Sequence, residues 1–436
     1  MSKNEYDVIV VGGGAAGLLG SATAANKGAR ALLLERNERA GRKLAITGKG
    51  RCNLTNDCSV GEVLENIPTG GRFLFSALNG FAPSDAIKLF QSLGVPLKTE
   101  RGNRVFPQSD KAADIVEALR SYGAKSGVMQ RRCRARGLTI ENGRITGVST
   151  PEGHIACSSV ILATGGLSYP ATGSTGDGYE MAKACGHTVT ALRGSLVPLV
   201  AKADICAGEQ RRAEKQHACA KMQGLTLKNV RISVHDGAKK PVFEDFGEIL
   251  FTHFGLSGPL ALSASAHMRD FDDKEFYITI DLKPGLDEKK LDLRILRDFE
   301  KYSNRAFSNA LGDLLNRSMI PVIVEKSGIP PDTKVHSVSR EQRLDMIKLL
   351  KGFRIDIAGP RPVEEAIVTS GGVETLEINP KTMESKIVKG LYFAGEIINA
   401  DAYTGGFNLQ IAWSTSYAAG TSAAMALINQ GRKSLS

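Results

Sequence analysis

The stretch that decides the fold is residues 6–36, YDVIVVGGGAAGLLGSATAANKGARALLLER. Its apolar run at residues 8–11 stops at a glycine, which is typical of a buried strand. Small residues follow, as in a helix that packs closely on a sheet, and residues 31–34 form a second apolar run. Strand, glycine turn, helix and strand in this order predict the first βαβ unit of a doubly wound α/β domain.

The glycines of the turn are spaced as Gly12-x-Gly14-x-x-Gly17, and Glu35 ends the second strand. This spacing is typical of dinucleotide binding. Gly12 permits the tight turn, Gly14 lets a pyrophosphate approach the helix N-terminus, and Gly17 lets helix and strand come close. The carboxylate of Glu35 can accept hydrogen bonds from ribose hydroxyls. The alternative is a glycine turn with a purely structural role.

The connection after Glu35, ERNERAGRKLAITGKGRCNLTN, is long and rich in glycine and cations. A simple NAD domain usually proceeds to another helix and strand, so this connection favours FAD. Arg42 and Lys43 are placed to approach the pyrophosphate. Residues 48–56 are then expected to run beside the flavin ring.

At this point the sequence resembles the BaiN-like, aminoacetone-oxidase-type family of NAD(P)/FAD-dependent oxidoreductases. Matching blocks follow one another over nearly the whole chain: VGGGAAGL, GRKLAITGKGRCNLTN, TGGLSYPATGSTGDGYEMA, LFTHFGLSGP, VTSGGV, KGLYFAGEIINADAYTGGFN and QIAWSTSYAAG. The resemblance implies noncovalent FAD. It also implies one of three activities: reduction of a uridine of large-subunit ribosomal RNA to dihydrouridine, oxidation of aminoacetone, or reduction of conjugated steroid double bonds.

The order of elements predicts a two-dinucleotide-binding-type (Rossmann-like) α/β FAD domain that is interrupted by an insertion. Residues 1–190 form its first part and residues 353–436 its C-terminal part. Residues 191–352 are the inserted substrate domain, in which short alternating runs predict an antiparallel sheet or small barrel before a mostly helical stretch. A long helix from about residue 409 closes the chain. The substrate is expected in the cleft between the domains.

The residues that we expect to hold FAD lie in glycine-rich loops or at strand ends. Among them, the amides of the glycine pair near the final helix can reach the O2 edge of the flavin, where the helix dipole stabilises negative charge. No second full GxGxxG occurs, so NADPH, NADH or neither is left open as the reductant. The full set is Gly12, Gly14, Ala15, Ala16, Gly17, Glu35, Arg36, Arg42, Lys43, Gly50, Arg51, Asn53, Thr164, Gly165, Thr175, Asp177, Gly395, Glu396, Gly405, Gly406, Phe407 and Asn408.

Three side chains are candidates for catalysis. Cys52 is a small residue packed against the flavin, a general acid that protonates the substrate carbon, or a disulfide partner of Cys58. Its neighbour Arg51 is expected to lower the pKa of the thiol. His253 is a structural histidine or a pocket residue that bonds or protonates the substrate. Tyr403 is a packing aromatic or a polar group beside the flavin.

The charge distribution and the cysteine spacing indicate which partners and which cellular compartment to expect. The formal net charge is +10, with cations concentrated in the basic segments 120–136 and 193–240. These segments favour contact with RNA phosphates, although a solvated basic face is the alternative. The seven cysteines are scattered without CxxC, which predicts neither a metal site nor a disulfide framework and suits the cytoplasm. The apolar run at residues 8–25 is too glycine-rich for a membrane span.

The sequence therefore leaves three functions open. The first is reduction of a uridine in 23S ribosomal RNA by hydride transfer from FAD. The second is a small-molecule oxidase or reductase that acts on an amine or a conjugated enone. The third is a noncatalytic, flavin-bound RNA-binding factor. The oligomeric state is not predicted.

Overall fold

The computed structural model describes residues 5–203 and 217–433. The chain forms two compact units, of which the first, here called the Rossmann unit, comprises residues 1–195 and 363–436. The second, here called the barrel unit, comprises residues 196–362. The chain therefore leaves the Rossmann unit once and returns to it once, as an inserted domain requires.

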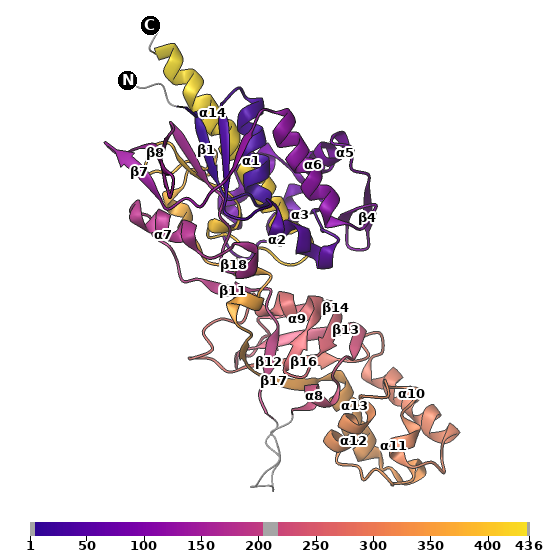
Figure 1. Cartoon of the computed structure of the whole chain (residues 1–436). Helices are drawn as coiled ribbons and strands as arrows, with labels where there is room; N and C mark the ends of the chain where they lie inside the picture. Colours follow the sequence, from indigo (N-terminus) through magenta and orange to yellow (C-terminus); the bar gives the residue numbers. More distant parts are fainter. Residues whose placement is uncertain (1–4, 204–216, 434–436) are drawn as a thin grey trace. The chain divides into compact units, whose positions relative to one another are not determined.

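A five-stranded parallel sheet with the order β19–β10–β1–β2–β6 forms the centre of the Rossmann unit (Figure 1). Its central strands are apolar and buried along their whole length, because helices and a strand of a second sheet pack against them. The strands are β1 (Val8–Val11), β2 (Ala31–Glu35), β6 (Met129–Arg132), β10 (Ser159–Leu162) and β19 (Leu391–Phe393).

Helix α1 (Ala15–Asn26) packs directly against the long helix α14 (Phe407–Lys433). A Cβ atom at Gly420 would lie 2.5 Å from the carbonyl oxygen of Gly20, so only glycine allows this approach. The sequence predicted that this helix of small residues packs on a sheet, and α1 does contact β1 and β2; its contact with α14 was not predicted. The other helices of this unit are α2 (Arg42–Ile46), α3 (Val60–Glu65), α4 (Gly71–Gly80), α5 (Pro83–Ser92), α6 (Ala112–Lys125) and α7 (Asp177–Ala184).

Three small antiparallel sheets complete the Rossmann unit. One is a meander that leads into β10. Another pairs β3 and β4 with β5, and the third pairs the two strands at which the chain crosses between the units. Their members are β7 (Gly137–Glu141), β8 (Arg144–Thr150) and β9 (Gly153–Ala156); β3 (Thr55–Asn56), β4 (Leu97–Glu100) and β5 (Arg104–Pro107); and β11 (Arg193–Ser195) with β18 (Val368–Ser370).

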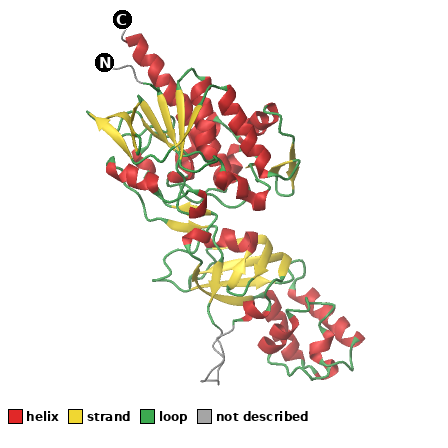
Figure 2. Ribbon diagram, viewed as in Figure 1, coloured by secondary structure: helices red, strands yellow, loops and turns green. Residues whose placement is uncertain are grey.

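The barrel unit contains a closed antiparallel barrel with the order β12–β15–β14–β13–β16–β17 (Figure 2). Strand residues alternate between buried and partly exposed, as in β16, so one side chain in two fills the barrel interior. This confirms the predicted small barrel. The strands are β12 (Leu199–Ala201), β13 (Thr226–His235), β14 (Phe243–Phe251), β15 (Gly255–Ser257), β16 (Phe276–Asp281) and β17 (Phe353–Pro360).

Helices accompany the barrel and share its hydrophobic core. Most come from the stretch between β16 and β17, which confirms the predicted helical part of the insertion. They are α8 (Ala218–Lys221), α9 (Gly258–Ser265), α10 (Glu288–Lys301), α11 (Phe307–Ala310), α12 (Ile320–Ser327) and α13 (Arg340–Lys351). Over residues 5–203 and 217–433, no helix combines the length and apolar character that a membrane crossing needs.

The predicted end of the insertion at residue 352 needs a correction. Strand β17 begins at residue 353 and pairs with β16 and β12, so it closes the barrel instead of opening the C-terminal part of the Rossmann unit. The barrel unit runs to residue 362. The prediction placed the boundary at the end of a helical pattern, whereas the structure places it after the strand that the barrel needs for closure.

Candidate functional site

The glycine turn after β1 has the geometry that the motif predicts. Gly12 has φ +104°, and a Cβ atom there would lie 2.5 Å from the carbonyl oxygen of Ala163. A Cβ atom at Gly17 would lie 1.7 Å from the carbonyl oxygen of Gly12. At Gly14, which precedes α1, a Cβ atom would meet nothing within 4 Å. Gly12 and Gly17 are thus required by the fold, and Gly14 borders open space at a helix N-terminus.

Glu35 is buried at the end of β2 and is fixed by three donors. Its Oε2 accepts from the backbone N–H of Gly13 at 2.6 Å, and its Oε1 accepts from the backbone N and Nδ2 of Asn37 at 2.7 and 2.8 Å. The carboxylate therefore lies beside the glycine turn, where a ribose contact was predicted. Ala15 and Ala16 begin α1 at the same turn, so their amides lie at the helix N-terminus.

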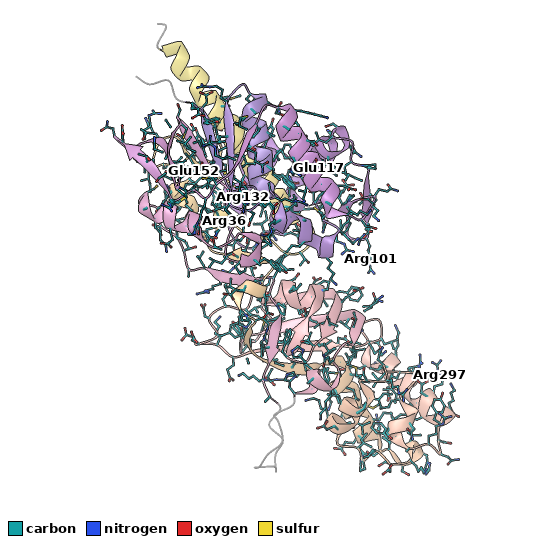
Figure 3. The ribbon with its side chains drawn as sticks, viewed as in Figure 1. Arg36, Arg101, Glu117, Arg132, Glu152 and Arg297 are labelled. Carbon is teal, nitrogen blue, oxygen red and sulfur yellow. The ribbon has the colours of Figure 1, made fainter. Side chains whose placement is uncertain are left out.

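An ionic cluster joins the loop after β2 to the start of α7. Arg36 donates to Thr175 Oγ1 at 2.6 Å and to Asp177 at 3.3 Å, and Arg134 donates to Asp177 at 2.8 and 3.1 Å. Burial raises the pKa of Asp177, but the hydrogen bonds from Arg134 and Thr175 outweigh it and hold that pKa below its usual value. The predicted cofactor residues Arg36, Thr175 and Asp177 are thus brought together, and Arg134, which was not predicted, joins them. Figure 3 labels Arg36.

A second cluster ties α2 to the segment after β19. The ammonium of Lys43 donates to Glu396 Oε2 at 2.7 Å and to Ser168 Oγ at 2.6 Å. Both charged side chains are about one-fifth exposed. Glu396 also accepts the backbone N–H of Thr369 at 2.8 Å. The pairing of Lys43 with Glu396 was not foreseen, because the two residues are distant in the sequence.

The loop GKGRCNLTN has an unusual backbone. Gly48, Lys49, Gly50 and Cys52 all have positive φ, between +57° and +83°. A Cβ atom at Gly50 would meet nothing within 4 Å, so this loop also borders open space. Two non-glycine residues in the left-handed region within four positions are uncommon and mark a loop whose path is fixed by its surroundings.

Unpaired polar atoms agree with a bound cofactor. Among the described residues, three buried side-chain polar atoms have no hydrogen-bond partner: Asn53 Oδ1, Thr164 Oγ1 and Thr421 Oγ1. The first two belong to residues that we predicted to hold FAD. Buried polar groups are normally satisfied, so a ligand with donors and acceptors fits these positions. These unpaired polar atoms, together with the open space at Gly14 and Gly50, fit a bound FAD.

Cys52 is fully buried in the hydrophobic core, and burial raises the pKa of its thiol to about 12. The expectation that Arg51 lowers this pKa is therefore wrong. The disulfide alternative is also wrong, because Cys52 and Cys58 are both free thiols. Protonated and enclosed, the thiol has the environment of a packing residue. Its role beside the flavin stays a prediction.

The guanidinium of Arg51 is bound by acidic side chains of the same unit, and its predicted contact with FAD stays a prediction. It contacts the carboxylates of Asp110, at 2.6 and 2.8 Å, and Glu100, and it lies over the Phe106 ring at 4.2 Å from the centroid. Lys98 joins the same carboxylates. The side chain thus holds the loop against β4 and β5. No sequence pattern linked Arg51 to acids some fifty and sixty residues away, so this role was missed.

The glycine pair at the start of α14 packs against the same loop. Gly405 and Gly406 have φ of +131° and +99°, and a Cβ atom at Gly406 would lie 2.5 Å from the carbonyl of Thr55. Asn56 Nδ2 donates to the carbonyl oxygen of Gly405 at 3.1 Å. Thr55 and Asn56 were not among the predicted site residues, although they bring the two segments together.

The other predicted residues of segment 395–408 differ in their contacts and burial. Gly395 donates its amide to Thr415 Oγ1 at 2.9 Å, and Phe407 is buried. The side chain of Asn408 donates to the carbonyl oxygen of Ala402 at 2.7 Å and accepts from its N–H at 3.0 Å, so it closes the loop that carries the glycine pair. The side chain of Asn408 thus braces this loop, and the cofactor contact predicted for Asn408 stays a prediction.

The other candidates lie as follows. Gly165, with φ +75°, continues from β10 beside Ser174. Tyr403 is half-buried and donates its backbone N–H to the carbonyl oxygen of Asn66. His253 belongs to the barrel unit, is exposed in the turn after β14, and makes an edge contact with Phe254. Catalytic roles for Tyr403 and His253 stay predictions.

The comparisons with known proteins agree over most of the chain. The family described as "HI0933-like protein Rossmann domain" matches residues 6–422. The chain is 31% identical to the 3-dehydro-bile acid delta(4,6)-reductase of Clostridium scindens, over 95% of this chain and 98% of that protein. It is also 31% identical to the ribosomal RNA dihydrouridine synthase of Escherichia coli, over 95% of this chain and 96% of that protein.

The fold is also found among solved structures. The 3-ketosteroid-delta4-(5alpha)-dehydrogenase from Rhodococcus jostii superposes with a TM-score of 0.51 at 16% identity, over 97% of this chain and 98% of that one. With the family match over nearly the whole length and the site residues that fit FAD, the chain belongs to the HI0933-like, BaiN-like family of Rossmann-type flavoproteins: it is an oxidoreductase, and its cofactor is FAD.

Proposed function

We propose that this protein reduces a uridine of 23S ribosomal RNA to dihydrouridine. One observation carries the choice of RNA: a row of cations on the exposed edge strand β6 lies beside the predicted ribose site. Arg132 is the register partner of Glu35, and Arg131 is the register partner of Leu34. Arg132 is exposed (Figure 3). Arg131 is partly exposed, and arginines at such an edge are suited to contacts with a phosphate backbone.

The two basic segments contribute unequally to this surface. In segment 120–136, Arg134 is paired with Asp177 and Arg120 with Glu117. The other four cations of the segment, which carry its uncompensated charge, are Lys125, Arg131, Arg132 and Arg136. In segment 193–240, residues 204–216 lie outside the described residues. Exposed cations of the described part include Lys239 and Lys240, in the turn between β13 and β14. The name of the Escherichia coli relative supports the same substrate class.

The residues of this chain have distinct tasks in the reaction. FAD, when bound and reduced by a donor such as NADPH or NADH, would supply the hydride that enters the C5=C6 bond of the uracil ring. Glu35 would bind ribose hydroxyls, and the N-terminus of α1 would hold the pyrophosphate. The amides of Gly405 and Gly406, at the start of α14, would stabilise negative charge on the ring. A proton must also reach the substrate, for which Cys52, Tyr403 and His253 are the candidates.

A small-molecule substrate is the second candidate. It is favoured by the Clostridium scindens relative, which has the same identity of 31% and covers the same share of the chain. A 3-dehydro-4-ene steroid and a uracil ring share a carbon–carbon double bond conjugated to a carbonyl, so one hydride chemistry serves both. Aminoacetone oxidation belongs to this class of small-molecule activities. A noncatalytic, flavin-bound RNA-binding factor is the third function, and NADPH, NADH or oxygen remains open as redox partner.

The experiment that tests the proposal compares acceptors in the oxidative half-reaction. The FAD-loaded protein is reduced without oxygen and mixed separately with unmodified 23S ribosomal RNA, with a 4-ene-3-ketosteroid and with buffer. We expect the yellow absorbance to return with the RNA, and nucleoside mass spectrometry to find dihydrouridine in it. Return of the absorbance with the steroid alone would support an enone reductase. No return with either acceptor would contradict both reductase activities, as expected of an amine oxidase or of the noncatalytic factor.

A further inference from the structure

The carboxylate of Asp401 connects both strands at which the chain crosses between the two units. Asp401 is 1% exposed and lies four residues before the glycine pair Gly405 and Gly406. Its Oδ2 accepts from Ser195 Oγ and its Oδ1 from Ser370 Oγ, both at 2.8 Å. Ser195 is the last residue of β11, and Ser370 is the last residue of β18.

Strand β11 ends where the chain leaves the Rossmann unit, and β18 begins five residues after the chain returns to it at Val363. They pair antiparallel in the register Arg193↔Ser370 to Ser195↔Val368. The Rossmann unit ends at Ser195, and the next residue, Leu196, is held at φ +54°. That conformation is uncommon for a branched residue and marks a backbone fixed by its surroundings. The backbone of Leu196 is therefore locally constrained, and Asp401 holds the residue immediately before it.

A second link joins β18 to the flavin segment. The backbone N–H of Thr369, the residue before Ser370, donates to Glu396 at 2.8 Å. Thr369 Oγ1 in turn accepts from the backbone N–H of Leu167 at 2.8 Å. Successive residues of β18 are thus bound to two acidic residues of the 395–408 segment, Glu396 through the backbone and Asp401 through the side chain.

The connection continues from Asp401 to the glycine pair without a flexible interval. Ala402 follows Asp401 and is held by two hydrogen bonds from the side chain of Asn408. Gly405 and Gly406 lie inside the loop that Asn408 closes, and Gly406 packs on Thr55 without room for a Cβ atom. A displacement of the glycine pair would therefore be transmitted to Asp401, and through it to both crossing strands.

We propose that Asp401 is a positioning residue that couples FAD binding to the order of the two crossing strands. FAD would fix the glycine loop, the loop would fix Asp401, and the carboxylate would fix Ser195 and Ser370. Coupling of this kind is reciprocal. If FAD binding favours the ordered strands by a given factor, ordered strands favour FAD binding by the same factor, and loss of the anchor removes both effects.

The experiment uses the full chain, with and without saturating FAD. Hydrogen exchange of residues 190–203 and 363–372 is measured by mass spectrometry, and the FAD dissociation constant by flavin fluorescence. The test variant is Ser195→Ala/Ser370→Ala, which removes both donors and leaves Asp401 in place. The control is Ser385→Ala, a buried serine whose hydroxyl bonds His187 and the backbone N–H groups of Ile387 and Val388, which lie outside the crossing strands. Asp401→Asn is the conservative variant that should keep the wild-type behaviour. One serine hydroxyl can still donate to the amide oxygen, and the other can accept from the amide N–H.

FAD should slow hydrogen exchange in both crossing strands of three proteins: the wild type, the Ser385→Ala control and Asp401→Asn. In the double serine variant this protection should be lost, and the FAD dissociation constant should rise by about 5- to 150-fold, the usual size of such coupling. The proposal is overturned if the double serine variant keeps the FAD-dependent protection and an affinity equal to that of the control. It is equally overturned if FAD leaves exchange in these strands unchanged in the wild-type protein.

Discussion

The backbone N–H of Gly13 donates a 2.6 Å hydrogen bond to Oε2 of Glu35, 22 residues further along the chain. This contact joins the turn after β1 to the end of β2, so the turn and the predicted ribose ligand form one rigid element. Asn37 occupies the other carboxylate oxygen with two donors. The glycine motif and the acidic residue are therefore a single site, and changes to its glycines can be separated into those that disturb the fold and those that disturb only the cofactor.

Gly14→Val should remove FAD and leave the apoprotein folded. A Cβ atom at Gly14 meets nothing within 4 Å, and the backbone φ of −79° is open to any residue. The added side chain would fill the space of the pyrophosphate. Gly17→Val is the contrast, because its Cβ would lie 1.7 Å from the carbonyl oxygen of Gly12 and must distort the turn. Thermal melting and flavin absorbance should show a stable colourless protein in the first case and an unfolded one in the second. A yellow Gly14→Val protein would show that the pyrophosphate lies elsewhere.

Cys52→Ala should cost stability and leave the oxidative half-reaction nearly unchanged. The side chain is fully buried, so its truncation should lower the free energy of unfolding by about 1 kcal/mol or more. Cys58→Ala, at a half-buried position six residues away, is the matched control and should cost less. Stopped-flow measurement of both half-reactions decides the role. A slowing of substrate-driven reoxidation by ~10²–10⁴-fold, with normal flavin reduction, would establish Cys52 as the general acid.

His187 should make the protein less stable in acid. Burial lowers the pKa of His187 below its usual 6.5, although its bond to Glu377 at 3.0 Å opposes that shift. Because the folded state then binds fewer protons than the unfolded state, stability is fully present above the unfolded pKa and is lost as the pH falls below it. Urea unfolding from about pH 7 to about pH 5 should show a shallower loss for His187→Gln than for the wild type. His154→Gln, at an exposed site, is the control and should follow the wild type. Equal slopes for all three proteins would contradict this assignment.

Arg131→Ser/Arg132→Ser should weaken RNA binding and flatten its salt dependence. If each arginine contacts one phosphate of an unpaired strand, the slope of log K against log salt should fall by about 0.7 for each. Arg101→Ser removes an exposed cation of the same unit away from β6 and should keep the wild-type slope (Figure 3). Binding of an rRNA fragment, measured by anisotropy at several salt concentrations, provides the test. An unchanged slope in the double variant would leave these residues as ordinary surface.

Features that depend on a local sequence pattern were predicted correctly. Strand pairs and ion pairs between residues that are distant in the sequence were not predicted. The βαβ unit, the barrel and the position of Glu35 were predicted because glycine spacing and apolar alternation act over a few residues. The membership of β17 in the barrel was missed, because strand closure depends on partners as distant as β12. The partners of Arg51 and Lys43 were missed for the same reason. An ion pair leaves no mark in the sequence until the fold brings its members together.

The measurement that tests the central claim most directly is the dihydrouridine content of 23S ribosomal RNA. An Escherichia coli strain that lacks its own ribosomal RNA dihydrouridine synthase would express this protein or its Gly14→Val variant. We expect nucleoside mass spectrometry to find dihydrouridine restored by the wild-type protein and absent with the variant. Ribosomal RNA that stays without dihydrouridine, although the expressed protein is folded and carries FAD, would contradict the account.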